Sequence, residues 1–239
     1  MRGCLFVVLL AVAIGVFVVV VGLPAVAAGV LTTAVQAAGL QSDDTTVTVS
    51  SDPPTDLVGL RADRVRIRAT DATFRGLDIG SLDITLSDVS LADRTAQGVS
   101  GRMDDVSVPV QGEDPIMLTS ITLTGGANHV IATTTLPAAQ AEARISDAIE
   151  AKLGRRPTDV SLAAPDRVTI TVGGLEVHGR LVVTPSGDLV ARITDGPAAG
   201  DEVVMLTGGE DIPVHLTSVT VTPGGDLRLV GELAIPLLG

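Results

Sequence analysis

Three arginines occupy alternate positions in one short stretch of the sequence, at Arg64, Arg66 and Arg68. The residues between them are apolar, and such strict alternation is typical of a β-strand that is buried on one face only. Guanidinium groups along one strand face could bind a phosphate group, because their planar forks match its oxygens. The alternative, which we favour, is a solvated sheet face on which the arginines pair with Asp83 or Asp88 of a neighbouring strand.

Four apolar side chains are further candidates for a binding site. Met103, Met117 and Met205 could line an adaptable cavity, because the flexible thioether accommodates ligands of varied shape. Phe74 is the only aromatic residue after the apolar N-terminal segment, and it joins the methionines as a candidate ligand contact. Filling of an ordinary core is the more common role of each methionine taken singly.

Catalytic signatures are missing from the sequence, which has no nucleophile elbow, phosphate-binding loop or zinc-protease motif. His129, His178 and His215 fall on separate predicted strands, and we assign them no chemistry. Cys4 is the sole cysteine and lies in the N-terminal segment, so the remainder has no disulfide, thiol nucleophile or cysteine metal site. We expect a binding protein that is not an enzyme and has no cofactor and no metal.

The N-terminal segment indicates where the protein acts. Residues 4–31 carry no charged or strongly polar side chain, and a helix of that length can cross a ~30 Å hydrocarbon core at ~1.5 Å per residue. Arg2 precedes the segment and the next basic residue is Arg61, so we expect the N-terminus in the cytoplasm and the remainder outside. We predict that residues 1–31 remain as a signal anchor; cleavage after Ala27, with secretion to the cell envelope, is the alternative.

The part beyond this segment is acidic and nearly free of aromatic side chains. Of 16 basic residues only Arg2 precedes it, so it carries 15 against 28 acidic residues. This charge argues against nucleic acid as a partner. Its core must be built from Val, Leu, Ile, Ala and Thr, which favours sheet over helix. The predicted fold class is therefore α+β and β-dominated.

Short alternating and apolar runs predict a series of antiparallel strands from residue 64 onward. One helix interrupts them over residues 137–153, with proline in its first turn and Gly154 after its end. Hairpin turns are predicted at residues 185–188 and 223–226. The apolar stripe of the helix consists of Ala141, Ile145, Ala148 and Ile149.

Several segments of the sequence recur about a hundred residues later, which is typical of an internal duplication. Residues 118–126 (LTSITLTGG) return as 216–225 (LTSVTVTPGG), and residues 63–67 and 76–79 return near 166–170 and 174–177. We therefore predict a short helix and linker over residues 32–54, then a duplicated β-rich domain over 55–239. Its halves cover about 55–137 and 138–239. Chance similarity between Thr- and Val-rich strands is the alternative.

Three predicted strands are apolar on both faces, at residues 116–118, 181–183 and 203–206. We expect both faces of such strands to be covered. One helix with a narrow, alanine-rich stripe cannot cover a sheet of about ten strands, so either the sheet folds over on itself or another apolar body lies inside it. A lipid could be that body.

Residues 54–60 (PTDLVGL), 63–69 (DRVRIRA), 76–79 (GLDI) and 82–89 (LDITLSDV) carry a resemblance to a known family. The domain that they open resembles the LmeA family of actinobacterial cell-envelope phospholipid-binding proteins. The resemblance implies a fold similar to the tubular lipid-binding domains, in which a curved antiparallel sheet wraps around one or two helices. It also implies a phosphoinositide-type phospholipid as ligand and a role in envelope lipid or lipoglycan assembly.

Together these features predict a protein of the cell membrane or envelope that shields acyl chains of a phospholipid in an apolar cavity. A structural or adhesive envelope module without ligand is the first alternative, and an envelope hydrolase with an unfamiliar site is the second. A continuous cavity would separate the lipid-binding protein from the structural module. The candidate lipid contacts are Phe74, Met103, Met117, Met205, Arg64, Arg66 and Arg68.

Overall fold

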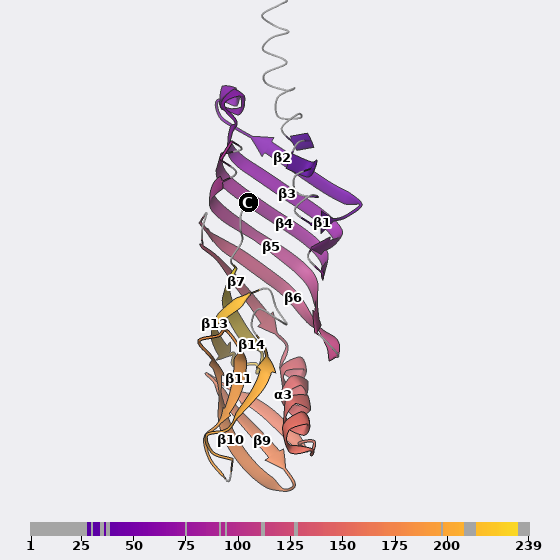
Figure 1. The fold of residues 1–239 in the computed structure, drawn as a ribbon, viewed down its shortest axis with the longest axis vertical. Helices are drawn as coiled ribbons and strands as arrows, with labels where there is room; N and C mark the ends of the chain where they lie inside the picture. Colours follow the sequence, from indigo (N-terminus) through magenta and orange to yellow (C-terminus); the bar gives the residue numbers. More distant parts are fainter. Residues whose placement is uncertain are drawn as a thin grey trace, which may run out of the picture.

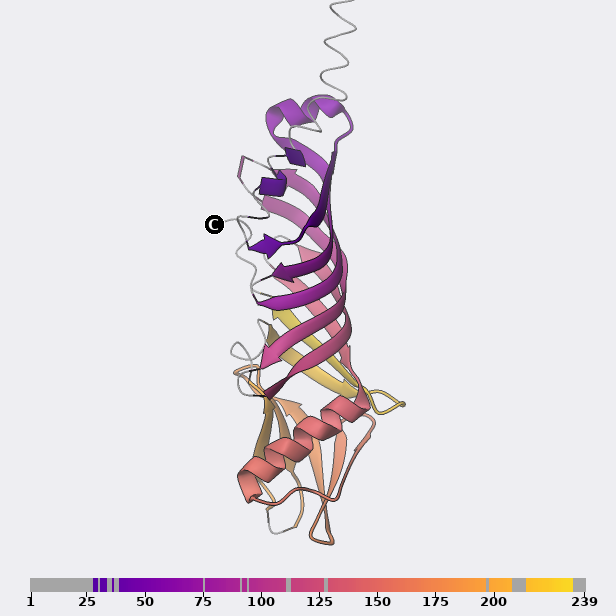
Figure 2. The same cartoon turned by 90° about the vertical axis from the view of Figure 1, so that its right-hand side faces the viewer.

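Two antiparallel sheets and one long helix make up most of the part of the chain that the structure describes (Figures 1 and 2). The computed structural model describes residues 28–29, 31–33, 36, 39–74, 76–90, 92–93, 95–110, 113–126, 129–196, 198–207 and 214–233. Within these residues the expected β-dominated class with antiparallel sheets is confirmed.

Nine strands form the long sheet, which fills the upper part of Figure 1 and is curved, so that one of its faces is concave (Figure 2). β1 and β2 both pair with β3 at one edge, and β13 lies at the other. In spatial order the strands are β1 (Leu40–Gln41) and β2 (Asp44–Ser50), then β3 (Arg61–Phe74), β4 (Leu77–Ser90), β5 (Thr95–Val110), β6 (Glu113–Gly126), β7 (His129–Leu136), β14 (Leu227–Leu233) and β13 (His215–Val221).

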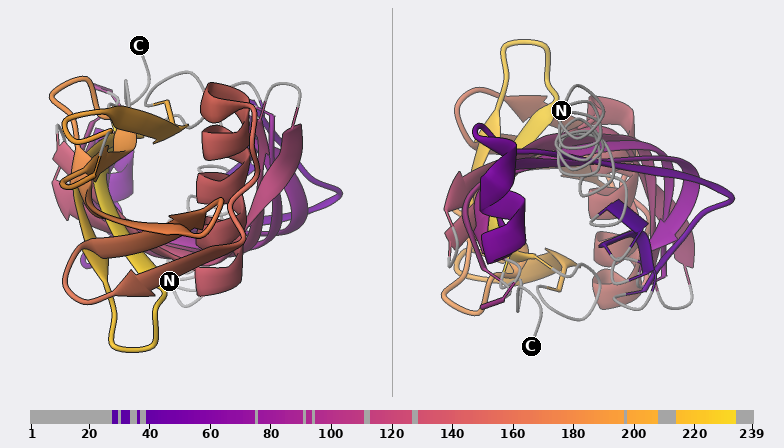
Figure 3. Two further views of the ribbon diagram at one scale, coloured as in Figure 1. Left: turned by 90° about the horizontal axis from the view of Figure 1, so that it is seen from below. Right: turned by 90° about the horizontal axis from the view of Figure 1, so that it is seen from above.

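Five shorter strands form the small sheet, in the order β12 (Glu202–Leu206), β11 (Leu189–Ile193), β10 (Leu175–Val183), β9 (Arg167–Val172) and β8 (Asp159–Ala163). The helix α3 (Ala138–Leu153) contacts both edge strands of this sheet, β12 and β8. The sheet therefore curves around the helix, and the two form a ring when viewed along the long axis (Figure 3).

The predicted helix and hairpin turns are confirmed. Ala141, Ile145 and Ile149 of the predicted stripe are buried, and Ala148 is partly buried against the same core. In each turn a threonine N–H donates to an aspartate carbonyl four residues later, at 2.9 Å from Thr184 and 2.8 Å from Thr222.

The first turn of α3 is held by residues far away in the sequence. Pro137 offers no side-chain cap, and the N–H of Ala138 instead donates to Oδ1 of Asp226 at 3.0 Å. The side-chain amide of Gln140 bonds both backbone groups of Met117, accepting at 3.2 Å and donating at 3.1 Å. These bonds fix α3 against β6 and against the β13–β14 turn, both of which belong to the long sheet.

Along the long strands, side chains point alternately to the concave and the convex face, and this alternation shifts twice. The shifts keep the apolar side chains on the concave face. On β5 the buried residues change from Val99 and Met103 to Val106 and Val108. The shift falls at Asp105, which has a left-handed φ of 53°, and Asp71 and Asp88 have similar φ values of 47° and 49° on β3 and β4. Aspartate is among the few non-glycine residues that adopt this conformation readily. A single left-handed residue in an extended strand changes the face on which the next side chain appears.

Opposite one of these shifts, at Gly80, the neighbouring strand comes so close that only glycine fits. A Cβ on Gly80 would lie 2.9 Å from Cβ of Asp105 on the neighbouring strand. Because that distance is shorter than normal contact, the pairing of β4 with β5 at this point needs a residue without a side chain.

A short 3-10 helix, η2 (Pro54–Gly59), lies at the upper tip of the long sheet (Figure 1). Its Leu57 belongs to a buried cluster with Val49, Val65 and other residues of the sheet, and Ala28 and Leu31 pack against that cluster. The predicted membrane segment, residues 4–31, lies outside the described residues except for its last few. Among the described residues, no helix is long and apolar enough to cross a bilayer.

The repeated segments lie on strands in comparable hairpins. Residues 118–126 belong to β6, which pairs with β7, and residues 216–221 belong to β13, which pairs with β14. However, β5 pairs with β6, whereas β12 and β13 lie in different sheets. The internal duplication stays a prediction.

Candidate functional site

The concave face of the long sheet is a continuous apolar surface. Two buried clusters occupy its two ends, and Ile67 and Leu86 pack against both of them. Ile67, Ile84 and Leu86 are only half-buried, although all three are large and apolar. Hydrophobic surface is therefore left open between the two clusters, where an apolar ligand would gain by covering it.

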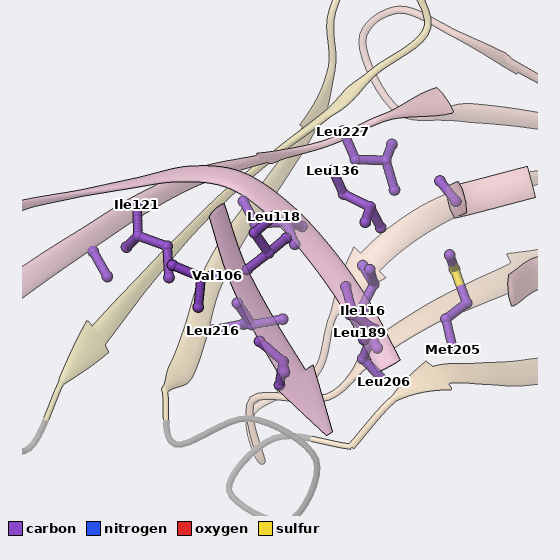
Figure 4. Close-up of a cluster of buried hydrophobic side chains, with 14 of the residues drawn as sticks. Val106, Ile116, Leu118, Ile121, Leu136, Leu189, Met205, Leu206, Leu216 and Leu227 are labelled. Carbon is purple, nitrogen blue, oxygen red and sulfur yellow. The ribbon is translucent and has the colours of Figure 1, made fainter. Parts of the chain in front are cut away.

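An apolar cavity of about 70 Å³ lies where the long sheet meets the small one. Figure 4 shows side chains from both sheets converging at this junction, with Leu118 and Leu216 from the long sheet and Leu206 from the small one. The cavity is lined by Leu77, Met103, Val108, Ile116, Leu118, Ile121, Ala132, Thr134, Leu136, Leu206, Val214, Leu216, Leu229 and Gly231.

The cavity presents almost no polar group. Thr134 is the only polar side chain in its lining, and its hydroxyl donates to the carbonyl of Ser120 at 2.8 Å. Because that hydroxyl is already bonded, a ligand must be recognised here by its shape and by its apolar surface.

Gly231 lets β13 come close to the cavity wall. A Cβ on Gly231 would lie 2.3 Å from Cγ1 of Val214 and 2.8 Å from the carbonyl oxygen of His215. A residue without a side chain is therefore needed at this position for the close approach of Val214, which lines the cavity together with Leu216, the partner of Gly231 in the ladder.

The four apolar candidates lie in different places. Met103 is 8% exposed and lines the cavity, and Phe74 is partly buried against the same core. The side chain of Met117 is 47% exposed, and its backbone N–H donates to the side chain of Gln140. Met205 is buried and borders a second hollow. The expectation that both faces of residues 116–118 and 203–206 are covered is wrong for Met117 and for Val204, which is 51% exposed.

The second hollow has a volume of about 370 Å³ and lies between α3 and β12. Arg144, Asp147 and Lys152 border it, and Nζ of Lys152 donates to the carbonyl of Glu202 at 2.8 Å. This hollow is larger than the cavity, but its charged, open lining suits acyl chains less well.

The three arginines lie on the opposite face from the apolar surface. Nε of Arg66 donates to Oδ1 of Asp83 at 2.7 Å, and Arg68 donates to the same carboxylate. The hydrogen bond from Arg66 lowers the pKa of Asp83 below its ordinary value. The side chain of Arg64 makes no hydrogen bond or ion pair within the described residues. Arg66 and Arg68 thus pair across the ladder, as the solvated-face interpretation expects.

Sequence reasoning did not find most of the cavity lining. Leu77, Val108 and Leu136 come from three strands, and each is an ordinary apolar residue in an alternating run. The available signal was the shift in alternation at Asp105, which shows that Met103 and Val108 share a face although their spacing is odd.

A curved antiparallel sheet with an open apolar concave face and an apolar cavity defines a protein that binds lipid-like ligands. The comparison with known families agrees with this class. The chain matches the LmeA-like phospholipid-binding family over residues 18–232, and it belongs to that family. The resemblance stated above is thereby confirmed, and the ligand class is phospholipid. No curated protein and no solved structure gave a match.

Proposed function

We propose that the chain holds one phospholipid with its acyl chains along the concave face of the long sheet, shielded from water. The observation that carries this proposal is the half-buried row of Ile67, Ile84 and Leu86, which leads toward the apolar cavity. Covering such surface is favourable by about 25 cal/mol per Å². The protein acts by binding and not by catalysis.

The cavity volume constrains how the lipid lies. An engineered cavity of about 150 Å³ binds benzene, so a hollow of about 70 Å³ is too small for a whole phospholipid. Only the end of an acyl chain enters the cavity, and the rest lies along the open concave face. The head group then remains in solvent.

We further propose that the protein works on the outer side of the cytoplasmic membrane, anchored by residues 1–31. The apolar run over residues 4–31 supports this location. There the chain would support assembly of envelope lipids or lipoglycans, with a phosphoinositide-type lipid as its ligand. The family resemblance supports that role.

Photo-crosslinking tests the binding mode. The full chain is reconstituted into vesicles that contain a phospholipid with a photoreactive acyl chain, and adducts are mapped by mass spectrometry. We expect adducts on the concave strands, and fewer of them in Met103→Trp, which fills the cavity. Met117→Trp is the matched control, because the same change is made at an exposed site on β6.

A second variant covers the case in which Met103→Trp fails to fold. Ile84→Gln places a polar group on the half-buried concave surface and should reduce adducts, and the chain should still fold because Ile84 is only partly buried. Equal labelling of all variants, or labelling confined to the convex face, would exclude the groove and favour a module with a dry core. Comparing phosphatidylinositol with phosphatidylcholine probes tests the head-group preference.

A further inference from the structure

The upper tip of the long sheet exposes large apolar side chains that nothing in the described residues covers. Val58, in η2, is 66% exposed, the highest value among large hydrophobic residues of the described part. Leu60 follows η2 directly and is 50% exposed. Two such residues at one tip are more than the single scattered apolar side chains normal on a surface.

The backbone conformation of Leu60 is a second, independent observation. Leu60 has φ 57° and ψ 36°, in the left-handed region, and its N–H donates to the carbonyl of Leu57 at 3.1 Å. Glycine or asparagine is the residue usually found at such a position. A leucine here accepts an unfavourable backbone conformation without the gain of burial, and such outliers are concentrated at functional sites.

The position of the N-terminal segment is the third observation. Ala28 and Leu31 pack against the cluster that contains Leu57 of η2. The 27 residues before Ala28, apolar from Cys4 onward, therefore join the molecule at the same end as the exposed tip. A membrane that held this segment would therefore lie at the η2 end of the molecule.

The concave apolar surface also reaches this end. The cluster at η2 is linked to the cavity region by Ile67 and Leu86, which contact both. A lipid that leaves a bilayer at the tip would meet apolar side chains along the way to the cavity.

We propose that the tip formed by η2 and Leu60 inserts its apolar side chains into the surface of a phospholipid bilayer and so sets the concave face beside the lipid. This inference rests on the proposed binding of phospholipid by that face. The exposed charges near the tip are mixed, with Asp52 and Asp56 beside Arg61 and Arg64. The contact therefore depends on apolar insertion, and a phosphatidylcholine bilayer is sufficient for it.

Tryptophan fluorescence tests the contact, because the chain has no Trp and no Tyr. Full-length Val58→Trp is reconstituted into phosphatidylcholine vesicles with or without bromine on the acyl chains. We expect a blue-shifted emission that brominated lipid quenches strongly. The matched control is Leu175→Trp, at a leucine that is 51% exposed in the small sheet at the opposite end of the molecule (Figure 1). Its emission should be quenched several-fold less.

Adding Leu60→Asn to the Val58→Trp chain separates membrane contact from folding. Asparagine suits the left-handed conformation, so thermal stability should be unchanged or higher, while quenching falls. Equal quenching at positions 58 and 175, or quenching at 175 alone, would overturn the proposal. The proposal would also be overturned if tryptophan at position 58 is not quenched.

Two further measurements separate the tip from the groove. Detergent-solubilised Val58→Trp with one equivalent of brominated phosphatidylcholine should be quenched several-fold less than the same chain in brominated vesicles, because one bound lipid supplies far fewer bromine atoms than a bilayer around the tip; equal quenching would overturn the assignment to the bilayer. Photo-crosslinking of the same chain reports on the groove. Adducts without quenching would exclude only the tip, and quenching without adducts would exclude only the groove.

Discussion

The long sheet and the small sheet are built from the same kinds of residue and both have partly buried apolar side chains, but only the small sheet has a described long helix across its two edges. In the small sheet Leu189 and Ala191 are fully buried, in the same hydrophobic cluster as Ile145 of α3. On the long sheet Ile67 and Ile84 remain half-buried. The difference comes from coverage, because α3 contacts both edges of the small sheet, while no described helix of comparable length lies on the concave face of the long one.

This contrast assigns different tasks to the two regions. A closed core gives stability, since fully buried side chains such as Leu189 have partners on all sides. An open apolar face gives less stability but leaves surface for a ligand. The small sheet and α3 therefore anchor the lower end of the long sheet, and the cavity lies at the junction between them.

The largest expected effect belongs to the closed core. Leu189→Ala should reduce the free energy of unfolding by about 2–5 kcal/mol, because a fully buried side chain leaves a cavity that cannot collapse completely. Denaturant unfolding of the full chain in detergent measures this change. A loss no greater than that of Ile84→Ala would contradict the distinction between closed and open regions.

The second effect concerns the shift in alternation that keeps the concave face apolar. Asp105→Val should cost about 1–2 kcal/mol, because a β-branched residue is strongly disfavoured at the φ of 53° found there. Asp105→Asn and Asp105→Gly are the controls and should unfold at nearly the wild-type denaturant concentration. If all three variants lose stability equally, the carboxylate and not the backbone conformation is responsible.

A smaller loss is expected on the open face without lipid. Ile84→Ala should cost about 1 kcal/mol, because a partly exposed side chain has only part of its transfer free energy to lose. Adding phospholipid should widen the gap between wild type and variant, since bound lipid covers Ile84. A gap that does not respond to lipid would place the ligand elsewhere.

The smallest effect is expected on the convex face. The pKa of Asp83 is lowered in the folded chain, so its pair with Arg66 stabilises at neutral pH and that contribution is lost as the pH falls through the folded pKa. Asp83→Asn should therefore differ slightly from wild type at neutral pH and not at acid pH, and high salt should shrink the difference. Asp159→Asn, at an exposed strand position, is the control.

Local patterns in the sequence determined much of this molecule. The helix of residues 138–153 was predicted from the proline before it and the glycine after it. The TPSGD and TPGGD segments predicted two hairpin turns. Alternation of arginine with valine and isoleucine placed β3 and its two faces. The Gly, Asp and apolar patterns at the start of the domain were sufficient to indicate the phospholipid-binding family. These features depend on neighbours in the chain, so a single sequence contains them.

Only the tertiary structure decided which side chains form the cavity. β7 pairs with β14, which brings Leu229 beside Thr134 although 95 residues separate them in the sequence. The left-handed conformation of Asp105 put Met103 and Val108 on one face, while Met117 and Val204 turned outward. Period-two alternation is a local property, whereas a cavity is made by pairing between distant strands and by the points where the alternation shifts. For that reason the sequence indicated the ligand class, whereas only the fold shows the apolar groove that we propose for the ligand.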